Sequence, residues 1–261
     1  MPMCGRIAVI ASPEETAAFV GVGDLESFPP RYNVAPTQPI LVVMAGPQRP
    51  PGSNLPDRMA MLARWGLIPA WTKNPGDMPL LFNARSESAI DKASFKTAMR
   101  HRRALIPVSG FYEWKKLPGN RRQPYWLRPR KGGLVALAGL METWSEPGGS
   151  EIDTAAILTT GASADILHIH DRMPVVIQPE DFARWLDCRT REPRDVAELM
   201  RPAQPDFFEQ IPVSEMVNKV ANVGPEIQDR VEPLPEAAPE KAAKPKVEKR
   251  KSSDDDQMKL F

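Results

Sequence analysis

Cysteine, histidine and long apolar runs are scarce in this chain of 261 residues. Two cysteines, Cys4 and Cys188, are too few for a disulfide framework or for the paired CxxC motifs of a zinc site. The three histidines have no cysteine or carboxylate group at ligand spacing, which argues against a metal. No apolar run approaches the ~20 residues of a membrane span, and no N-terminal segment indicates export. We therefore expect a soluble, cytoplasmic protein without metal or cofactor, and a monomer.

Net charge is also nearly absent, at +1, but the charges are unevenly distributed. Residues 96–131 contain eleven Lys or Arg and a single acid, Glu113, so this segment carries +10. Cations attract phosphates and aromatic faces stack on unpaired bases, so basic residues mixed with aromatics favour a single-stranded nucleic acid. The alternative is a solvated face of a sheet. The aromatic residues of the segment are Phe111, Tyr112, Trp114, Tyr125 and Trp126.

Strand patterns outnumber helical patterns along the chain. Apolar, β-branched and aromatic runs predict strands at 6–10, 39–44, 59–69, 104–114, 124–129, 134–144 and 154–160. Helical patterns occur at 13–20, 87–100, 179–186 and 194–201. Ser12, Pro13 and Glu15 form a predicted N-cap and capping box for the first helix. Because the strands do not alternate with the helices, we expect an α+β fold with a largely antiparallel, barrel-like β core and peripheral helices.

The composition changes at about Val231. Residues 231–261 are rich in proline, alanine and lysine, and they contain no aromatic residue until Phe261. Such a segment cannot bury enough apolar surface to offset its chain entropy. The sequence therefore predicts one folded domain over residues 1–230 and a disordered tail over residues 231–261.

Six short stretches carry the chemically informative residues. They are MCGR (3–6), RYNVAPTQ (31–38), NARSES (83–88), GFYEW (110–114), HDRMP (170–174) and the softer VNKVANVGPE (217–226). In this order and at these spacings they resemble the SRAP family, the SOS-response-associated proteins that crosslink to abasic sites in single-stranded DNA. The resemblance covers residues 3–228. It implies the SRAP fold, no cofactor, and single-stranded DNA with abasic sites as the partner, including junctions with a duplex.

The resemblance implies that Cys4 performs the covalent step. An abasic deoxyribose is partly open as an aldehyde, and a primary amine adds to it and loses water to give an imine. The thiol of an N-terminal cysteine can then close on the imine carbon to form a stable thiazolidine, whereas an internal cysteine offers only a reversible hemithioacetal. An α-amine with a pKa near ~8 is partly neutral at physiological pH. The family chemistry therefore requires Cys4 as the first residue of the mature chain.

Three residues precede Cys4 in the sequence as written, and two explanations stay open. Translation that starts at Met3, followed by loss of that methionine, would expose the aminothiol. Alternatively, the chain would cleave itself before Cys4, as the peptidase label of the family suggests. If neither occurs, thiazolidine chemistry is excluded and only DNA binding remains.

The resemblance also implies roles for residues of the other motifs. Glu113 would move protons during imine formation and strand scission, although a structural salt bridge to an arginine is the alternative role. His170 would help to open the sugar ring, a task that suits imidazole's titration near neutrality. Asn83 would orient the reacting group. The implied DNA contacts are Arg6, Arg85 and Arg172 with phosphates, Thr159 through its hydroxyl, and Trp71 and Trp114 with the bases that flank the lesion.

The last five residues, QMKLF, fit the Q-x-x-L-F pattern of peptides that bind the bacterial sliding clamp. In an extended peptide, Leu260 and Phe261 would fill an apolar pocket while Gln257 bonds at its rim. This hypothesis would place the protein at replication forks on the nucleoid. The alternative is an ordinary apolar terminus.

Two further functions remain open at the level of sequence. One is a cysteine N-terminal-nucleophile hydrolase or peptidase, in which the Cys4 thiolate attacks a carbonyl with Glu113 or His170 as base. The other is a non-covalent binder of single-stranded DNA, for which the charge pattern alone suffices. The leading hypothesis is a sensor that captures abasic sites covalently and shields them, with lyase activity as a related reaction.

Overall fold

The frame of the molecule is a closed ring of five strands. The computed structural model describes residues 4–146 and 148–236. Neighbouring strands pair in the order β4-β3-β6-β9-β10, antiparallel throughout, and β10 closes the ring by pairing parallel with β4. This arrangement confirms the α+β class and the largely antiparallel, barrel-like core. The ring strands are β3 (Pro39–Ala45), β4 (Arg58–Trp65), β6 (Arg103–Val108), β9 (Val135–Ser145) and β10 (Glu151–Gly161).

Three short strands extend the barrel wall. Both β5 (Asn83–Arg85) and β11 (Arg172–Pro174) pair with β10, whereas β12 (Val176–Ile177) pairs with β9. The register sets Arg85 opposite Thr159 and Arg172 opposite Gly161. The NARSES and HDRMP motifs are therefore brought to the same end of β10.

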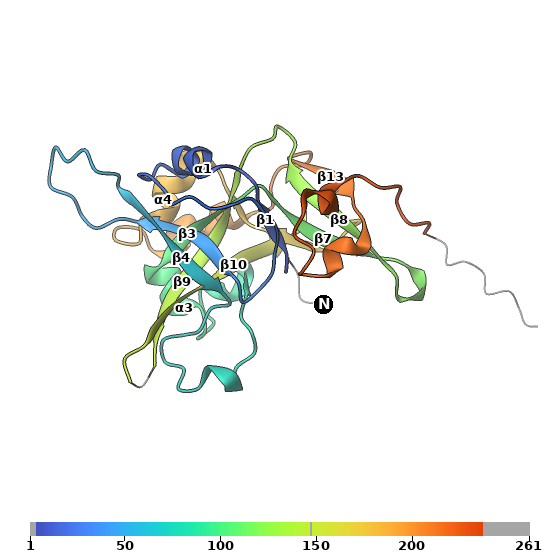
Figure 1. The fold of residues 1–261 in the computed structure, drawn as a ribbon. Coiled ribbons are helices and arrows are strands. Elements are labelled where there is room, and N and C mark those ends of the chain that lie inside the picture. Colours follow the sequence, from blue (N-terminus) through green and yellow to red (C-terminus); the bar gives the residue numbers. More distant parts are fainter. Residues whose placement is uncertain (1–3, 147, 237–261) are drawn as a thin grey trace, which may run out of the picture.

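A second, antiparallel sheet lies beside the barrel (Figure 1). Its strand order is β13-β8-β7-β1-β2. The predicted strand over 104–114 is in fact two strands, β6 in the barrel and β7 in this sheet. Gly110 begins β7 where the backbone passes close to β8, since a Cβ at this position would lie 2.3 Å from the Leu127 carbonyl oxygen. The strands are β1 (Ile7–Val9), β2 (Arg31–Val34), β7 (Gly110–Lys116), β8 (Arg122–Pro129) and β13 (Phe208–Pro212).

The helices are short and peripheral. The capping box predicted for α1 (Pro13–Val20) is present, with Ser12 and Glu15 bonding each other's backbone N–H groups. The helix expected over 87–100 is instead α2 (Ser86–Ala89) and α3 (Lys96–His101), because the intervening Asp91 and Ser94 favour turns over helix interior. α4 (Phe182–Leu186) follows a 3₁₀ turn. The 3₁₀ turns span Pro75–Asp77, Pro118–Asn120, Pro179–Asp181, Pro193–Met200, Glu215–Asn218 and Pro225–Gln228.

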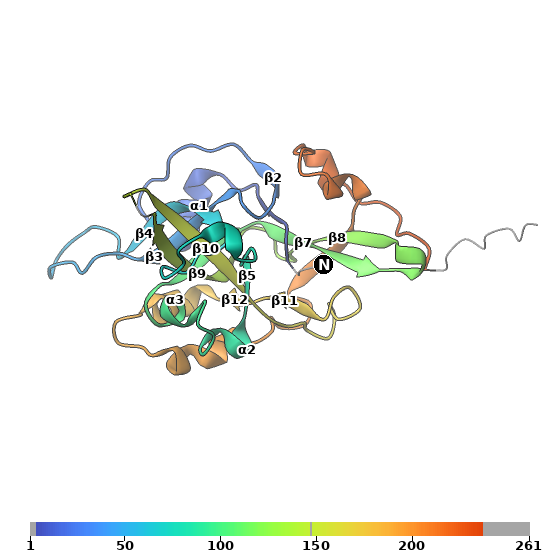
Figure 2. The same ribbon diagram turned by 90° about the horizontal axis from the view of Figure 1, so that it is seen from below.

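Packing on the two faces of the barrel wall separates the core into layers. One cluster fills the barrel and its contact with the second sheet, and it includes Cys4, Val42 and Trp65. Another lies under α1, α3 and α4, where Val43, Phe95 and Phe182 pack. The alternation of Val42 and Val43 follows from the two-residue period of a strand. In both ribbon views the β3–β4 loop and the β7–β8 hairpin project at opposite ends of the molecule (Figures 1 and 2).

The ordered backbone continues beyond residue 230, where the sequence predicts the start of the tail. Val231 N–H donates to the Pro212 carbonyl, and Leu234 N–H donates to Gln123 Oε1. These bonds hold the chain against β13 and β8 as far as residue 234, and Lys115 of β7 pairs with Glu236. The predicted clamp-binding residues lie outside the described residues. Among the residues that the structure describes, no helix is long and apolar enough to cross a membrane.

Candidate functional site

A cleft of about 490 Å³ gathers residues from most of the sequence motifs. Segments far apart in the sequence, from the chain start to the turn at 215–218, contribute its walls. Two cations, Lys116 and Arg122, lie on the β7–β8 hairpin at its rim. The lining residues are Gly5, Arg6, Pro36, Phe82, Glu113, Trp114, Lys116, Arg122, His170 and Asn218.

Cys4 and Glu113 meet at the base of this cleft. The pairing of β1 with β7 sets Ile7 opposite Phe111, so the residues before β1 run alongside the end of the GFYEW motif. The Cys4 N–H donates to Glu113 Oε1 at 2.6 Å. Asn83 Nδ2 approaches the Cys4 carbonyl oxygen at 3.4 Å from the other side. The backbone of Cys4 has φ 39°, a left-handed conformation that is strained for a non-glycine residue.

Glu113 is a buried carboxyl with a raised pKa. Its side chain is almost inaccessible, at 3% exposure. Burial raises its pKa to about 7, aided by the charge of Asp171, while hydrogen bonds from the Cys4 and Trp114 backbone act in the opposite direction. No arginine or lysine in the described part of the chain forms an ion pair with it, so the alternative role as a salt-bridge partner is not observed. A carboxyl that titrates near neutrality can both accept and return a proton.

The thiol of Cys4 is in the opposite state from a nucleophilic thiolate. It is fully buried, and burial together with the nearby Glu113 raises its pKa well above the ordinary value. Reactive cysteines of hydrolases instead have a lowered thiol pKa. The group of Cys4 that is hydrogen-bonded to the Glu113 carboxyl is its nitrogen.

His170 lies on the opposite wall of the cleft in a half-buried position. Burial lowers its pKa, although Asp171, whose Oδ1 lies 2.9 Å from Nδ1, favours the charged form. The Arg172 N–H also approaches Nδ1, at 3.1 Å. These contacts hold the ring through Nδ1, and His170 lines the cleft.

Arg6 is tied into the wall of the cleft. Its Nη1 donates to Asn33 Oδ1 at 2.6 Å and to the Val217 carbonyl at 2.5 Å. Asn33 in turn donates to the carbonyls of Val217, Lys219 and Asn222. The RYNVAPTQ and VNKVANVGPE motifs are thus joined as one wall. The carbonyls that accept from Asn33 lie more than 180 positions along the chain, so this role of Asn33 is not visible in the sequence.

Arg85 and Arg172 differ in what surrounds them. The Arg85 side chain is exposed, and within the described residues it forms no hydrogen bond or ion pair. Arg172 donates to both carboxylate oxygens of Glu87, at 2.6 and 2.9 Å, and to the Thr159 carbonyl. Thr159 itself is fully buried, and its hydroxyl donates to the Ala84 carbonyl. Glu87 belongs to the NARSES motif, but sequence reasoning did not single it out.

The two tryptophans implied to contact bases occupy different places. Trp114 lines the cleft, where its Nε1 donates to Asn218 Oδ1 at 2.7 Å and Arg6 stacks on its ring. Trp71 is 58% exposed and does not line the cleft. Its Nε1 only weakly contacts the Ala93 carbonyl, at 3.4 Å.

The basic and aromatic segment 96–131 does not form one continuous face. Phe111, Tyr112 and Trp126 are buried in the cores of the small sheet, so they cannot stack on bases. Several of its cations pair with acids from distant parts of the chain, as Arg128 does with Glu209. The physical reason is that side chains on both faces of β7 and β8 are buried, Phe111 in the cluster shared with the barrel and Tyr112 and Trp126 in a separate cluster, a partition that the linear pattern does not show.

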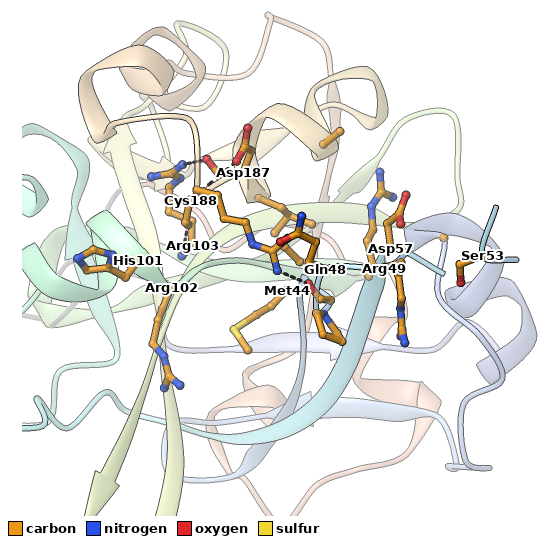
Figure 3. A pocket seen from close by; sticks show the side chains of 18 of the residues that line it. Met44, Gln48, Arg49, Ser53, Asp57, His101, Arg102, Arg103, Asp187 and Cys188 are labelled. Carbon is orange, nitrogen blue, oxygen red and sulfur yellow. Dashed lines mark hydrogen bonds between the residues drawn. The ribbon is translucent and has the colours of Figure 1, made fainter. Parts of the chain in front are cut away.

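A larger cavity, of about 860 Å³, lies between the β3–β4 loop and α4 (Figure 3). It is rich in arginine, but Arg103 is buried and donates to four backbone carbonyls, which include those of Trp185 and Asp187. Arg189 donates to the Gly46 carbonyl. Within residues 4–146 and 148–236, no group of three or more His, Cys, Asp or Glu is placed to share a metal ion.

The fold and the cleft define a class of protein: a small β-barrel in which a cysteine nitrogen contacts a buried carboxyl, in a cleft that an imidazole and cations also line. Residues 3–220 match the family described as SOS response associated peptidase (SRAP). The match covers well over half of the chain, and the chain belongs to this family.

Named relatives agree with that assignment, and solved structures share the fold. The chain is 34% identical over 228 residues to abasic site processing protein YoqW of Bacillus subtilis, covering 86% of this chain and 98% of that protein. It is 32% identical over 223 residues to abasic site processing protein HMCES of Gallus gallus, covering 76% and 65%. A Bacteroides thetaiotaomicron protein shares the fold, with a TM-score of 0.73 at 22% identity over 87% of this chain and 100% of that one. A phage-related protein of Bordetella bronchiseptica has a TM-score of 0.62 at 27% identity, covering 81% and 95%.

Proposed function

We propose that this protein processes abasic sites in single-stranded DNA by linking them covalently to Cys4. The observation that carries the proposal is the 2.6 Å contact between the Cys4 nitrogen and the buried Glu113 carboxyl. In a chain that begins at Cys4, that nitrogen is the α-amine. The names of the relatives, which are abasic site processing proteins from bacteria and vertebrates, support the same substrate.

The reaction follows from the positions of the groups. Glu113 accepts a proton from the Cys4 ammonium, and the neutral amine attacks the open-chain aldehyde of the abasic sugar. The resulting hydroxyl leaves as water when Glu113 returns the proton, which gives the protonated imine; transfer of its nitrogen proton to water gives the imine. The thiol then adds across the C=N bond: sulfur bonds to carbon and the thiol proton passes to nitrogen. The product is a thiazolidine, and the net change is the loss of one water.

Residues around Cys4 and Glu113 exchange protons with the sugar, orient the amine and attract the DNA phosphates. His170, whose pKa burial lowers, can exchange a proton with the sugar hydroxyl through Nε2. Asn83 holds the Cys4 carbonyl and so orients its amine. Lys116 and Arg122 at the rim of the cleft, together with the exposed Arg85, offer charge to the phosphates of a single strand or of a junction. Such contacts read the backbone rather than base sequence.

Intact mass spectrometry tests the proposal. The protein is expressed from Met3, so that removal of this methionine exposes Cys4, and is incubated with a single-stranded oligonucleotide that carries one abasic site. We expect a mass increase equal to the oligonucleotide minus one water. A matched oligonucleotide with an intact base should give no adduct. Absence of the adduct from a chain shown by its mass to begin at Cys4 would contradict the proposal.

Cys4→Ala separates this function from its alternatives. The variant should lose the adduct and keep reversible binding to single-stranded DNA, as a non-covalent binder would. Borohydride should trap an imine on the wild-type protein. A thiolate hydrolase would instead turn over an amide without DNA, which the raised thiol pKa argues against.

Recruitment through the C-terminal pentapeptide is a separate proposal. Gln257, Leu260 and Phe261 would bind the bacterial sliding clamp and bring the protein to replication forks. Deletion of residues 257–261 should abolish co-elution with the clamp and leave crosslinking intact. Co-elution that survives the deletion would contradict the role of the peptide.

A further inference from the structure

The ion pair between Glu87 and Arg172 lies beside the candidate site. Arg172 directly follows the two residues His170 and Asp171, and its N–H contacts the imidazole of His170. Both terminal nitrogens of its guanidinium donate to Glu87, and Nη2 also donates to the Thr159 carbonyl. The Arg172 side chain is 16% exposed, whereas that of Glu87 is 53% exposed. The carboxylate of Glu87 is therefore the partner that faces solvent.

The geometry of this pair matches the way in which a guanidinium binds a phosphodiester. Both carboxylate oxygens of Glu87 accept from separate nitrogens of Arg172, at 2.6 and 2.9 Å, which is the two-pronged arrangement that phosphate oxygens also adopt. Arg85 stands close enough to Glu87 to lower its pKa further, after the larger effect of the Arg172 hydrogen bond. Arg85 in β5 and Arg172 in β11 thus both act on Glu87, at the end of β10 with which both strands pair.

We propose that Glu87 is a stand-in for a DNA phosphate: it holds Arg172 in the free protein and yields this guanidinium to a phosphodiester of the bound strand. This inference rests on the proposed function, since it concerns the same DNA. While Glu87 is in place, Arg172 is already oriented and no buried charge is left unpaired. Displacement then exposes the carboxylate to water, where it is well solvated, so the exchange replaces one anion by another at small cost.

The exchange has a measurable consequence for affinity and for salt dependence. In the wild type, binding at Arg172 must first break an ion pair. Glu87→Gln removes the competing charge, so the variant should bind an unmodified single-stranded oligonucleotide about fivefold more tightly at low salt. Arg172 would then contribute fully to counterion release. The plot of log affinity against log salt should become steeper by about 0.7, the value for one phosphate of a single strand.

Fluorescence anisotropy with a labelled, unmodified oligonucleotide and the full chain measures both quantities. Glu198→Gln is the matched control, because Glu198 is a similarly exposed partner of an arginine, Arg184, on another part of the surface, and its loss should change neither quantity. Arg172→Ala should weaken binding, and the double variant Glu87→Gln with Arg172→Ala should bind no better than Arg172→Ala. Glu87→Asp keeps the charge with a shorter reach, and it should fall between the wild type and Glu87→Gln.

Several results would overturn the inference. These are weaker or unchanged binding by folded Glu87→Gln, a gain that persists in the Arg172→Ala background, or an equal gain in Glu198→Gln. Thermal melting establishes folding, and if Glu87→Gln fails to fold, Glu87→Asp decides the question. Wild-type protein that neither binds single-stranded DNA nor forms the adduct would instead contradict the proposed function. Wild-type protein that does both, with Glu87→Gln behaving identically, would contradict this inference alone.

Discussion

Two cavities of this protein differ in size and in chemistry, and the smaller of the two holds the candidate site. The larger, of about 860 Å³, is lined by several arginines, but Arg103 and Arg189 donate to backbone carbonyls of the chain (Figure 3). The smaller, of about 490 Å³, brings together an acid whose pKa burial raises to about 7 and an imidazole whose pKa burial lowers. Volume and positive charge alone therefore do not identify a reactive site. Titratable groups with shifted pKa values in one cleft do so better.

The strongest test of this comparison removes one buried carboxyl near each cavity. Glu113→Gln should reduce the crosslinking rate by about 10²–10⁴-fold, because the variant cannot take a proton from the Cys4 nitrogen. Glu142→Gln is the control: this glutamate is also buried with a raised pKa, but it faces Arg102 at 3.6 Å near the larger cavity. The crosslinking rate of Glu142→Gln should equal that of the wild type. Quenched-flow gel assays measure both, and equal losses would contradict the division between the cavities.

The larger cavity should instead control stability. Arg103 is 1% exposed, and its guanidinium holds the segment that follows α4 through backbone carbonyls. Arg103→Met should lower the free energy of unfolding by about 3–5 kcal/mol, since buried carbonyls lose their donor. Urea unfolding measures this effect. Crosslinking per folded molecule should remain at the wild-type level, and a selective loss of crosslinking would show that this arginine belongs to the site.

Glu113 should also make the protein less stable as pH rises. Its folded pKa, at about 7, lies above the unfolded value, so the native state binds more protons between these two values. The contribution is present below the unfolded pKa of ~4.5 and is lost as pH rises toward 7, to a total of about 3 kcal/mol. Glu113→Gln should lack this loss and be more stable than the wild type at pH 8. Parallel urea titrations at pH 5 and pH 8 decide the matter, and a wild-type pH dependence retained by the variant would contradict it.

The crosslinking rate should respond to pH with the opposite sign. Below about pH 7 Glu113 is protonated and cannot accept a proton, so the rate should fall as the pH decreases. In Glu113→Gln the residual rate should follow the α-amine, with its pKa near ~8. Single-turnover rates across pH 5.5–9 would measure both profiles. The same midpoint in both proteins would show that another group controls the step.

The smallest effect is expected at Arg49, on the rim of the larger cavity. Arg49→Ala should alter neither DNA affinity nor crosslinking, because the DNA site is expected at the other cavity. Lys116→Ala, which removes one charge from the smaller cleft, should weaken binding and reduce the salt slope by about 0.7. Anisotropy titrations compare the two variants. Equal weakening would mean that the bound strand reaches both cavities.

Much of the fold could be predicted because its signals are local. The capping box of Ser12 and Glu15 and the apolar runs of β3, β9 and β10 depend on neighbours within a few residues. Prediction was poorer where local preference is weak or is overridden. The segment over 87–100 contains turn-forming residues between its two short helices. The run over 104–114 continues as strand on both sides of Ser109, so only the change of sheet reveals the break.

The candidate site shows the same division. The motifs themselves pointed to Cys4, Asn83, Glu113 and His170 as the residues with the relevant chemistry. Neither the engagement of Arg6 by Asn33 nor the pairing of Arg172 with Glu87 could be predicted, since each joins segments that are distant in the sequence. Phe111 and Tyr112 were expected among base-stacking aromatics and are buried instead.

The sequence by itself determined the local helix cap, the strand-rich class and the reactive residue types, because these depend on side-chain chemistry and short-range backbone preference. The tertiary structure alone decided that the Cys4 nitrogen meets a carboxyl 109 positions away, and that this carboxyl titrates near neutrality. The physical reason is desolvation: a pKa depends on which atoms exclude water from the group, and here those atoms come from strands and loops distributed along the whole chain.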